Sequence, residues 1–211
     1  MRVGVKICGL TTVADGRAAV AAGADAVGFV FWPHSSRAVA SERAREIAAA
    51  LPPFVARVGV FVDEQPETIS RIAGEVGLDV VQLHGDEDPA DLERLPRRVV
   101  KALRFGDAVR EAIGVWSGRG AGILLDAGSA ERPGGTGRRL DWPGVAALRD
   151  AAPWLMLAGG LDPENVAEAI RIVGPDAVDV SSGVESAPGV KDPARVAAFV
   201  RAARAAGEER A

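Results

Sequence analysis

The sequence predicts an α/β fold, a single-domain (β/α)8 TIM barrel, from three observations. Short apolar runs alternate with longer Ala-, Glu- and Arg-rich segments of helical period along the whole chain. This alternation gives eight strand–helix units in 211 residues, roughly 26 residues each, which is near the lower size limit of a closed barrel. No glycine-rich dinucleotide turn follows the first apolar run, which disfavours an open doubly wound sheet.

The expected strands are short runs rich in Val, Ile, Leu and Phe, and each leads into a turn or loop. They cover residues 2–8, 25–31, 55–62, 79–84, 98–104, 121–126, 154–158 and 177–181.

A segment of helical period follows each strand. Several of these segments begin with a capping residue or an early proline, as in Asp162-Pro163 and Asp192-Pro193, which is typical of helix amino ends. The expected helices cover residues 12–22, 41–51, 66–76, 88–95, 107–115, 141–151, 163–173 and 193–205.

Composition and charge exclude several classes of protein. The chain is 48% hydrophobic and 26% charged, the balance of a globular domain, and its net charge of -4 disfavours nucleic-acid binding. Apolar stretches fall well short of the roughly 20 residues of a membrane span, and the first residues lack the apolar run of a signal peptide. We expect a cytoplasmic domain over residues 1–206, a frayed tail at 207–211, and no nucleic-acid or membrane partner.

The first strand ends with two side chains of chemical interest. Because side chains alternate along a strand, Lys6 and Cys8 face one way, and Val5 and Ile7 face the other. With the apolar pair against the helices, Cys8 lies at the rim where barrel enzymes do their chemistry, although a free cysteine is often only a small apolar side chain. A buried Lys6 needs a carboxylate. Barrel closure brings Asp179 of the eighth strand to a similar depth, so we predict a Lys6–Asp179 contact.

Three other residues are candidates at the same rim. Asp126 ends the sixth strand, where a carboxylate points to function. His84 ends the fourth strand, and a packed histidine is an equally good interpretation. Arg37, in the loop after the second strand, has a planar donor fork suited to a carboxylate, although alone it would be interpreted as a solvated charge. Lys6, Asp179 and His84 are therefore candidates for residues that contact the reacting groups and support them without reacting themselves.

Glycine-rich turns after the last strands predict a phosphate site, because backbone N–H groups and helix amino ends bind phosphate in these barrels. The candidate residues are Gly159 and Gly160 after the seventh strand, Ser181, Ser182 and Gly183 after the eighth, and Gly135, Thr136 and Gly137 in the long sixth loop.

Lysine is rare in this chain. It occurs only at Lys6, Lys101 and Lys191, and the other basic residues among the 25 are arginine. Either a compact ammonium is required at these positions, or the bias is an accident of composition.

Several motifs occur in order: KICGLT, GFVFWPHSSR, VQLHGDE, LLDAGS, GGTG, LAGGLDPENV and DVSSGVE followed by GVKD. With them the chain resembles the phosphoribosylanthranilate isomerase family over almost its whole length. The resemblance implies a (β/α)8 barrel of tryptophan biosynthesis. The implied reaction is the Amadori rearrangement of N-(5-phosphoribosyl)anthranilate to 1-(2-carboxyphenylamino)-1-deoxyribulose 5-phosphate, without cofactor or metal. It also implies that Cys8 is the general base, that Asp126 is the general acid, and that Arg37 pairs with the anthranilate carboxylate.

This chemistry sets requirements for the acid and the base. Opening the ribose ring needs a proton on Asp126, so its pKa must be raised. Removing the C2' hydrogen needs the thiolate of Cys8, so we expect a depressed thiol pKa, through helix amino ends and the Lys6 ammonium. One departure stands out: Ser36 occupies a position where many family members have proline, which is expected to loosen the path to Arg37.

Two alternatives stay open. One is a related aminoaldose isomerase of the histidine pathway, which would want an acid where Cys8 stands. The other is a non-catalytic phosphosugar-binding barrel, against which the presence of Cys8, Asp126 and Arg37 argues. The expected partner is a small phosphorylated aminosugar, and the chain is expected to be a monomer or a homodimer.

Overall fold

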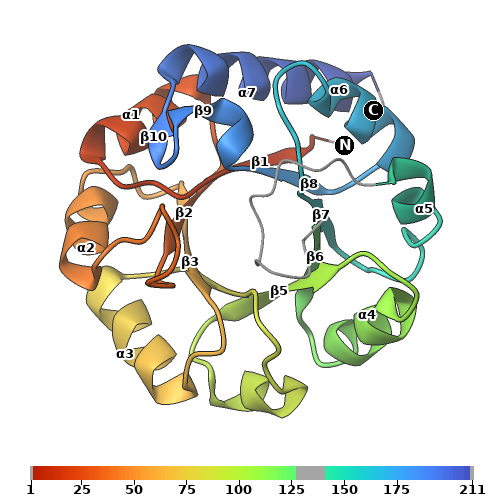
Figure 1. Ribbon diagram of the computed structural model, residues 1–211, viewed down its shortest axis with the longest axis horizontal. Coiled ribbons are helices and arrows are strands. Elements are labelled where there is room, and N and C mark those ends of the chain that lie inside the picture. The colour runs from red at the N-terminus through yellow and green to blue at the C-terminus, as the bar shows by residue number, and fades with distance from the viewer. Residues whose placement is uncertain (1, 127–140, 210–211) are drawn as a thin grey trace.

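The computed structural model describes residues 2–126 and 141–209, and it is a closed barrel of eight parallel strands inside a ring of helices (Figure 1). The barrel closes where β1 pairs with β8, in a register that places Lys6 beside Asp179. The strands are β1 Gly4–Cys8, β2 Ala26–Val30, β3 Ala56–Phe61, β4 Val80–Leu83, β5 Arg98–Arg104, β6 Gly122–Asp126, β7 Leu155–Leu157 and β8 Ala177–Val180. All eight expected strands are present, so the predicted fold class is confirmed.

Helices connect the strands on the outside of the barrel (Figure 1). The α-helices are α1 Val13–Ala22, α2 Ser41–Ala49, α3 Pro66–Val76, α4 Val109–Ser117, α5 Trp142–Ala146, α6 Val166–Val173 and α7 Pro193–Glu208, and η1 Pro89–Arg94 and η2 Ser182–Val184 are 3-10 turns. In the described part of the chain, no helix is long and apolar enough to cross a bilayer.

The structure differs from the sequence-based expectations at three helices. The helix expected at 88–95 is the 3-10 helix η1: none of its residues is fully buried, and only Leu92 and Leu95 of this segment pack, partly buried, against the core, which is too small a face to stabilise an α-helix. The helix expected at 141–151 ends at Ala146. Helix α7 extends to Glu208 because Gly207 is buried against Val3, so it includes part of the segment expected to fray; residues 210 and 211 lie outside the described residues.

A short hairpin that the sequence analysis did not anticipate follows η2. It pairs β9 Glu185–Ala187 with β10 Val190–Lys191 in antiparallel fashion. In Figure 1 the hairpin lies on the same side of the barrel as α1 and α7. This hairpin supplies two charged residues to the site described below.

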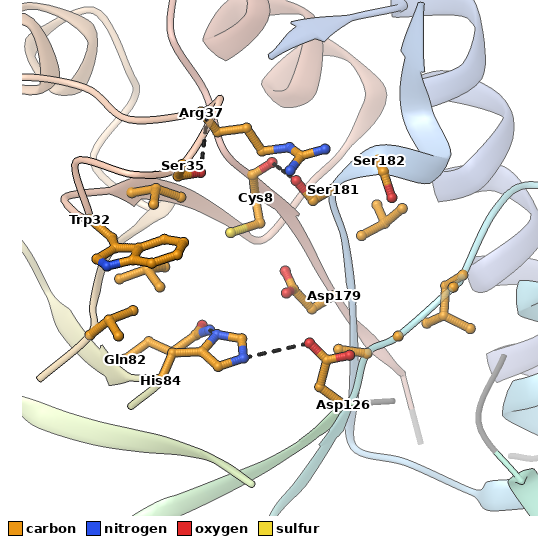
Figure 2. Close-up of a pocket in the computed structure, with 18 residues that line it drawn as sticks. Cys8, Trp32, Ser35, Arg37, Gln82, His84, Asp126, Asp179, Ser181 and Ser182 are labelled. Carbon is orange, nitrogen blue, oxygen red and sulfur yellow. Dashed lines mark hydrogen bonds and ion pairs between the residues drawn. The ribbon is translucent and has the colours of Figure 1, made fainter. Parts of the chain in front are cut away.

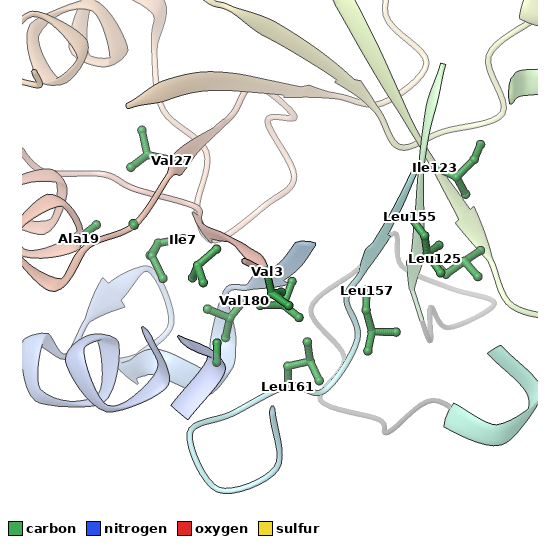
Figure 3. Close-up of a cluster of buried hydrophobic side chains, with 14 of the residues drawn as sticks. Val3, Ile7, Ala19, Val27, Ile123, Leu125, Leu155, Leu157, Leu161 and Val180 are labelled. Atoms are coloured by element: carbon green, nitrogen blue, oxygen red, sulfur yellow. The ribbon is translucent and has the colours of Figure 1, made fainter. Parts of the chain in front are cut away.

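The apolar core lies mainly between the strands and the helices. Outward-facing side chains such as Ile7, Val27, Ile123 and Leu157 pack there and are fully buried (Figure 3). Because Ile7 faces this layer, its neighbours Lys6 and Cys8 face the barrel interior, as predicted.

Candidate active site

The carboxyl ends of the strands surround a concave, partly open cavity, which is the usual shape of a small-molecule site. Figure 2 shows the Cys8 sulfur and the Asp126 carboxyl facing this cavity from β1 and β6. Trp32 also lines it. The other charged and polar lining residues are Ser35, Arg37, Gln82, His84, Asp179, Ser181 and Ser182, together with Gly159 and Gly160.

Cys8 occupies the last position of β1 and is 7% exposed. Its neighbour on β2 is Gly28, and a Cβ atom there would lie 2.7 Å from the Cys8 Sγ and 3.2 Å from the Lys6 Cε. No ordinary side chain fits at that distance, so the glycine provides the space in which the thiol sits.

Lys6 lies one layer below Cys8, and its side chain is 1% exposed. Its Nζ donates a hydrogen bond to Asp179 Oδ1 at 2.9 Å, so the predicted Lys6–Asp179 contact is confirmed. Burial alone would lower the pKa of Lys6, but the charges of Asp179 and Cys8 outweigh it and raise the pKa above its ordinary value. Lys6 is therefore a permanent cation beneath the thiol.

The expectation of a depressed thiol pKa is wrong. Burial raises the pKa of Cys8 above its ordinary value, and the Asp179 carboxylate raises it further. The ammonium groups of Lys6 and Lys191 lower it, but by less. The physical reason is that a thiolate in this pocket loses its hydration, while Asp179 already neutralises much of the Lys6 charge.

Asp126 ends β6 and is 5% exposed. His84 follows β4, and its Nε2 lies 3.5 Å from Asp126 Oδ2 (Figure 2). On the other side of the ring, His84 Nδ1 lies 3.4 Å from Nε2 of the buried Gln82. The imidazole thus bridges a buried amide and the candidate acid, and the interpretation of His84 as a residue that supports Asp126 is favoured over simple packing.

Arg37 reaches the cavity from the loop after β2, as expected, but its guanidinium already has a carboxylate partner. Its Nε donates to Glu185 Oε1 at 2.8 Å and its Nη2 donates to Glu185 Oε2 at 2.7 Å. Lys191 Nζ also donates to Glu185 Oε1, at 2.7 Å. Glu185 is not among the residues predicted from the sequence, although it ends the motif DVSSGVE.

The three lysines of the chain share one environment. Each is buried, and each forms an ion pair with a carboxylate: Lys6 with Asp179, Lys101 with Glu87 and Lys191 with Glu185. The Lys6 pair joins β1 to β8, the Lys101 pair joins β5 to the loop after β4, and the Lys191 pair joins the two strands of the β9–β10 hairpin. This favours the interpretation that lysine is used where a compact ammonium is needed.

The turn after β7 places Gly159 and Gly160 at the cavity with φ angles of 82° and 66°, in the left-handed region that glycine tolerates. Within residues 2–126 and 141–209, no hydrogen bond leads from their backbone N–H groups to another group. Gly183 lies after β8, and a Cβ there would lie 1.9 Å from the Leu161 carbonyl oxygen, so only glycine fits. These two turns pack tightly and lie next to Ser181 and Ser182.

The third group of phosphate candidates, Gly135, Thr136 and Gly137, lies outside the described residues. Among the residues that the structure describes, no cluster of three or more His, Cys, Asp or Glu side chains is suited to a metal ion.

Comparison with known proteins agrees with this geometry. Residues 5–202 match the family described as N-(5'phosphoribosyl)anthranilate (PRA) isomerase. The chain belongs to this family. The N-(5'-phosphoribosyl)anthranilate isomerase of Neisseria meningitidis serogroup C is 50% identical over 204 residues, which are 96% of this chain and 97% of that protein. That of Geotalea uraniireducens is 50% identical over 200 residues, 95% of this chain and 98% of its own.

Solved structures of the family have the same fold. Phosphoribosyl anthranilate isomerase from Thermotoga maritima superimposes with a TM-score of 0.89 at 44% identity, covering 96% of this chain and 99% of its own. A structure of the enzyme in complex with reduced 1-(o-carboxyphenylamino)-1-deoxyribulose 5-phosphate has a TM-score of 0.86 at 43% identity, with the same coverage.

Proposed function

We infer that this protein is a phosphoribosylanthranilate isomerase of tryptophan biosynthesis, in which Cys8 is the general base and Asp126 the general acid. The single observation that carries this assignment of roles is the placement of the thiol and the carboxyl group on one cavity, at the ends of β1 and β6. A proton donor and a proton acceptor on two sides of one substrate are what an aldose-to-ketose rearrangement requires.

The acid acts first. Protonated Asp126 donates its proton to the ribose ring oxygen as the bond from that oxygen to C1' breaks, and the anthranilate nitrogen supplies the electron pair of the new C=N bond. His84, 3.5 Å from the carboxyl oxygen, orients the acid. The product of this step is an open-chain iminium ion with an acidic C2' hydrogen.

The base acts second. The Cys8 thiolate removes the C2' proton, and the electron pair shifts to give an enolamine, which tautomerises to the ketone product. The Lys6 ammonium lies below the sulfur and lowers the free energy needed to form the thiolate. Burial acts in the opposite direction and makes the thiol the resting form. The space left by Gly28 keeps the sulfur in place for this step.

Two anchors hold the substrate between these groups. We assign the phosphate to the N–H groups of Gly159 and Gly160 and to the hydroxyls of Ser181 and Ser182, which line the cavity, while Gly183, the next residue after Ser182, stays a prediction for this anchor. Gly135, Thr136 and Gly137 stay a prediction for the same anchor. Arg37, which also lines the cavity, binds the anthranilate carboxylate.

The experiment that tests the roles compares Cys8→Ala with the wild-type protein. Loss of anthranilate fluorescence reports turnover, and the dissociation constant of inorganic phosphate or of a phosphosugar reports binding. We expect Cys8→Ala to lose turnover, with phosphate affinity unchanged. Full activity of Cys8→Ala would exclude Cys8 as the base.

Assays with both aminoaldose substrates separate the alternatives. Turnover of the histidine-pathway substrate would extend or replace the proposed activity, and binding without turnover by the wild-type protein would favour a non-catalytic phosphosugar-binding barrel.

The protein is proposed to work as a monomer or a homodimer in the cytoplasm. One 41% identical structure is described as monomers generated from dimeric phosphoribosylanthranilate isomerase of Thermotoga maritima. Sedimentation velocity distinguishes the two states for this chain, and cell fractionation tests the compartment.

A further inference from the structure

The Arg37 guanidinium has two edges that can bind a carboxylate, and one of them is occupied. The side edge, formed by Nε and Nη2, donates two hydrogen bonds to Glu185, and both side chains are largely buried, at 16% and 5% exposed. A guanidinium carries five N–H donors, so the end edge, formed by Nη1 and Nη2, retains a complete second fork. Glu185 therefore holds the guanidinium by its side edge and leaves the end edge available for a second carboxylate.

Glu185 is itself fixed in place. Lys191, whose side chain is fully buried, donates from Nζ to Glu185 Oε1 at 2.7 Å and to the Ser181 carbonyl oxygen at 3.2 Å. Burial alone would raise the pKa of Glu185, but the hydrogen bonds and charges of Arg37 and Lys191 hold the pKa below its ordinary value. Glu185 is thus an anion at neutral pH. Burial lowers the pKa of Lys191, and the Glu185 carboxylate counters this effect. With the Lys191 ammonium held in its 2.7 Å ion pair, Arg37, Glu185 and Lys191 together carry a net charge of about +1.

The rest of Arg37 is held by close packing. Gly9 has a φ of 78°, and a Cβ there would lie 2.6 Å from the Arg37 Cδ, so the arginine stem lies directly on the glycine. The Ser35 hydroxyl accepts a hydrogen bond from the Arg37 N–H at 3.1 Å. A Cβ on Gly189 of the hairpin turn would lie 2.7 Å from the Ser36 carbonyl oxygen. Ser36 was expected to loosen the path of the chain to Arg37. The Ser35 hydrogen bond and the close approach of Gly189 to the Ser36 carbonyl oxygen counter that loosening.

We propose that Glu185, carried by the β9–β10 hairpin, is a positioning residue that sets substrate specificity. It holds the side edge of Arg37, a residue that lines the cavity, and leaves the end edge as a preformed fork that selects aminosugars whose aromatic ring carries a carboxylate. The net positive charge of the cluster favours that anion over a neutral ring. This inference rests on the proposed function, in which Arg37 binds the anthranilate carboxylate.

The opposite role is also physically possible, and it gives the opposite result. If Glu185 competed with the substrate for Arg37, its neutralisation would free the guanidinium and tighten binding of a carboxylate. If it positions Arg37, neutralisation leaves an amide N–H group facing two cations, and the fork loses its orientation.

The test measures the dissociation constants of two probes. The first is reduced 1-(o-carboxyphenylamino)-1-deoxyribulose 5-phosphate, and the second is the same molecule without its ring carboxyl group. The wild-type protein is expected to bind the first more tightly. In Glu185→Gln, the preference is expected to fall by about 10- to 100-fold, the range of a charge-assisted hydrogen bond, with the second probe bound as before. Glu75→Gln, which removes the same charge from the exposed Arg71–Glu75 pair on α3, is the matched control and should retain the preference.

A double-mutant cycle separates positioning from a general structural effect. Glu185→Gln is expected to change the preference in the wild-type background and to have almost no effect in Arg37→Met, because the group on which it acts is then absent. Glu185→Asp keeps the charge but has a shorter side chain, so its preference for the carboxylated probe is expected to lie between those of the wild type and Glu185→Gln. It replaces Glu185→Gln in the test if that variant does not fold.

Three outcomes overturn the inference: equal weakening of both probes by Glu185→Gln, tighter binding of the carboxylated probe, or a wild-type protein with no preference between the probes. Failure of the proposed function is recognised separately, because the wild-type protein would then not turn over phosphoribosylanthranilate at all.

Discussion

Replacement of Lys6 by methionine tests whether the buried ion pair in the barrel is required for stability. Methionine keeps an unbranched stem of similar length but has no ammonium. Asp179, which is 9% exposed and accepts the 2.9 Å hydrogen bond, would then be a buried carboxylate without its cation. Removing one partner of such a pair costs about 3–5 kcal/mol in the free energy of unfolding.

That cost is large enough to measure easily. For a chain of 211 residues, each kcal/mol corresponds to roughly 2–4 °C in Tm, so Lys6→Met should lower Tm by roughly 6–20 °C. The double variant Lys6→Met/Asp179→Leu should recover most of this loss, because it also removes the isolated charge. Arg71→Met, which breaks the exposed i,i+4 pair with Glu75, should change the free energy by at most about 1 kcal/mol.

Urea unfolding in reducing buffer, followed by circular dichroism, measures these free energies, and thermal unfolding measures Tm. A loss below about 1 kcal/mol for Lys6→Met would contradict the reasoning. A double variant no more stable than the single one would also contradict it, since the loss would then come from packing and not from an unpaired charge.

The remaining predictions concern the pH dependence and the geometry of the site. Because burial raises the pKa of Cys8, kcat/KM should still increase with pH through and above the usual thiol range near about 8.5, and a plateau reached by about pH 7 would contradict this. Gly28→Ala should lower kcat/KM by about 10- to 100-fold because its Cβ displaces the thiol, whereas Gly74→Ala, with open space around it, should leave kcat/KM unchanged. Because the pKa of Glu185 is lowered on folding, its contribution to stability is present above the unfolded-state pKa of about 4.3 and is lost as pH falls through the lower folded-state value. Urea midpoints of the wild type and Glu185→Gln should therefore converge in acid.

Strand period and barrel closure explain the features that could be predicted from the sequence. Alternation along β1 put Lys6 and Cys8 inside the barrel, and the pairing of β1 with β8 in a closed sheet brought Asp179 to Lys6. The same rule placed Asp126 at the end of β6, facing the same cavity. These features depend on neighbours in the sheet, and the sequence pattern is sufficient to identify them.

Two features depended on the tertiary structure alone. The Arg37–Glu185 pair joins residues 148 positions apart, through a hairpin too short to have a clear sequence pattern. The raised pKa of Cys8 depends on the amount of water that all the surrounding strands exclude and on the balance of charges within a few ångströms. Local period and residue type determine which way a side chain points, but its desolvation and its charged partners are set by segments that only the closed barrel brings together.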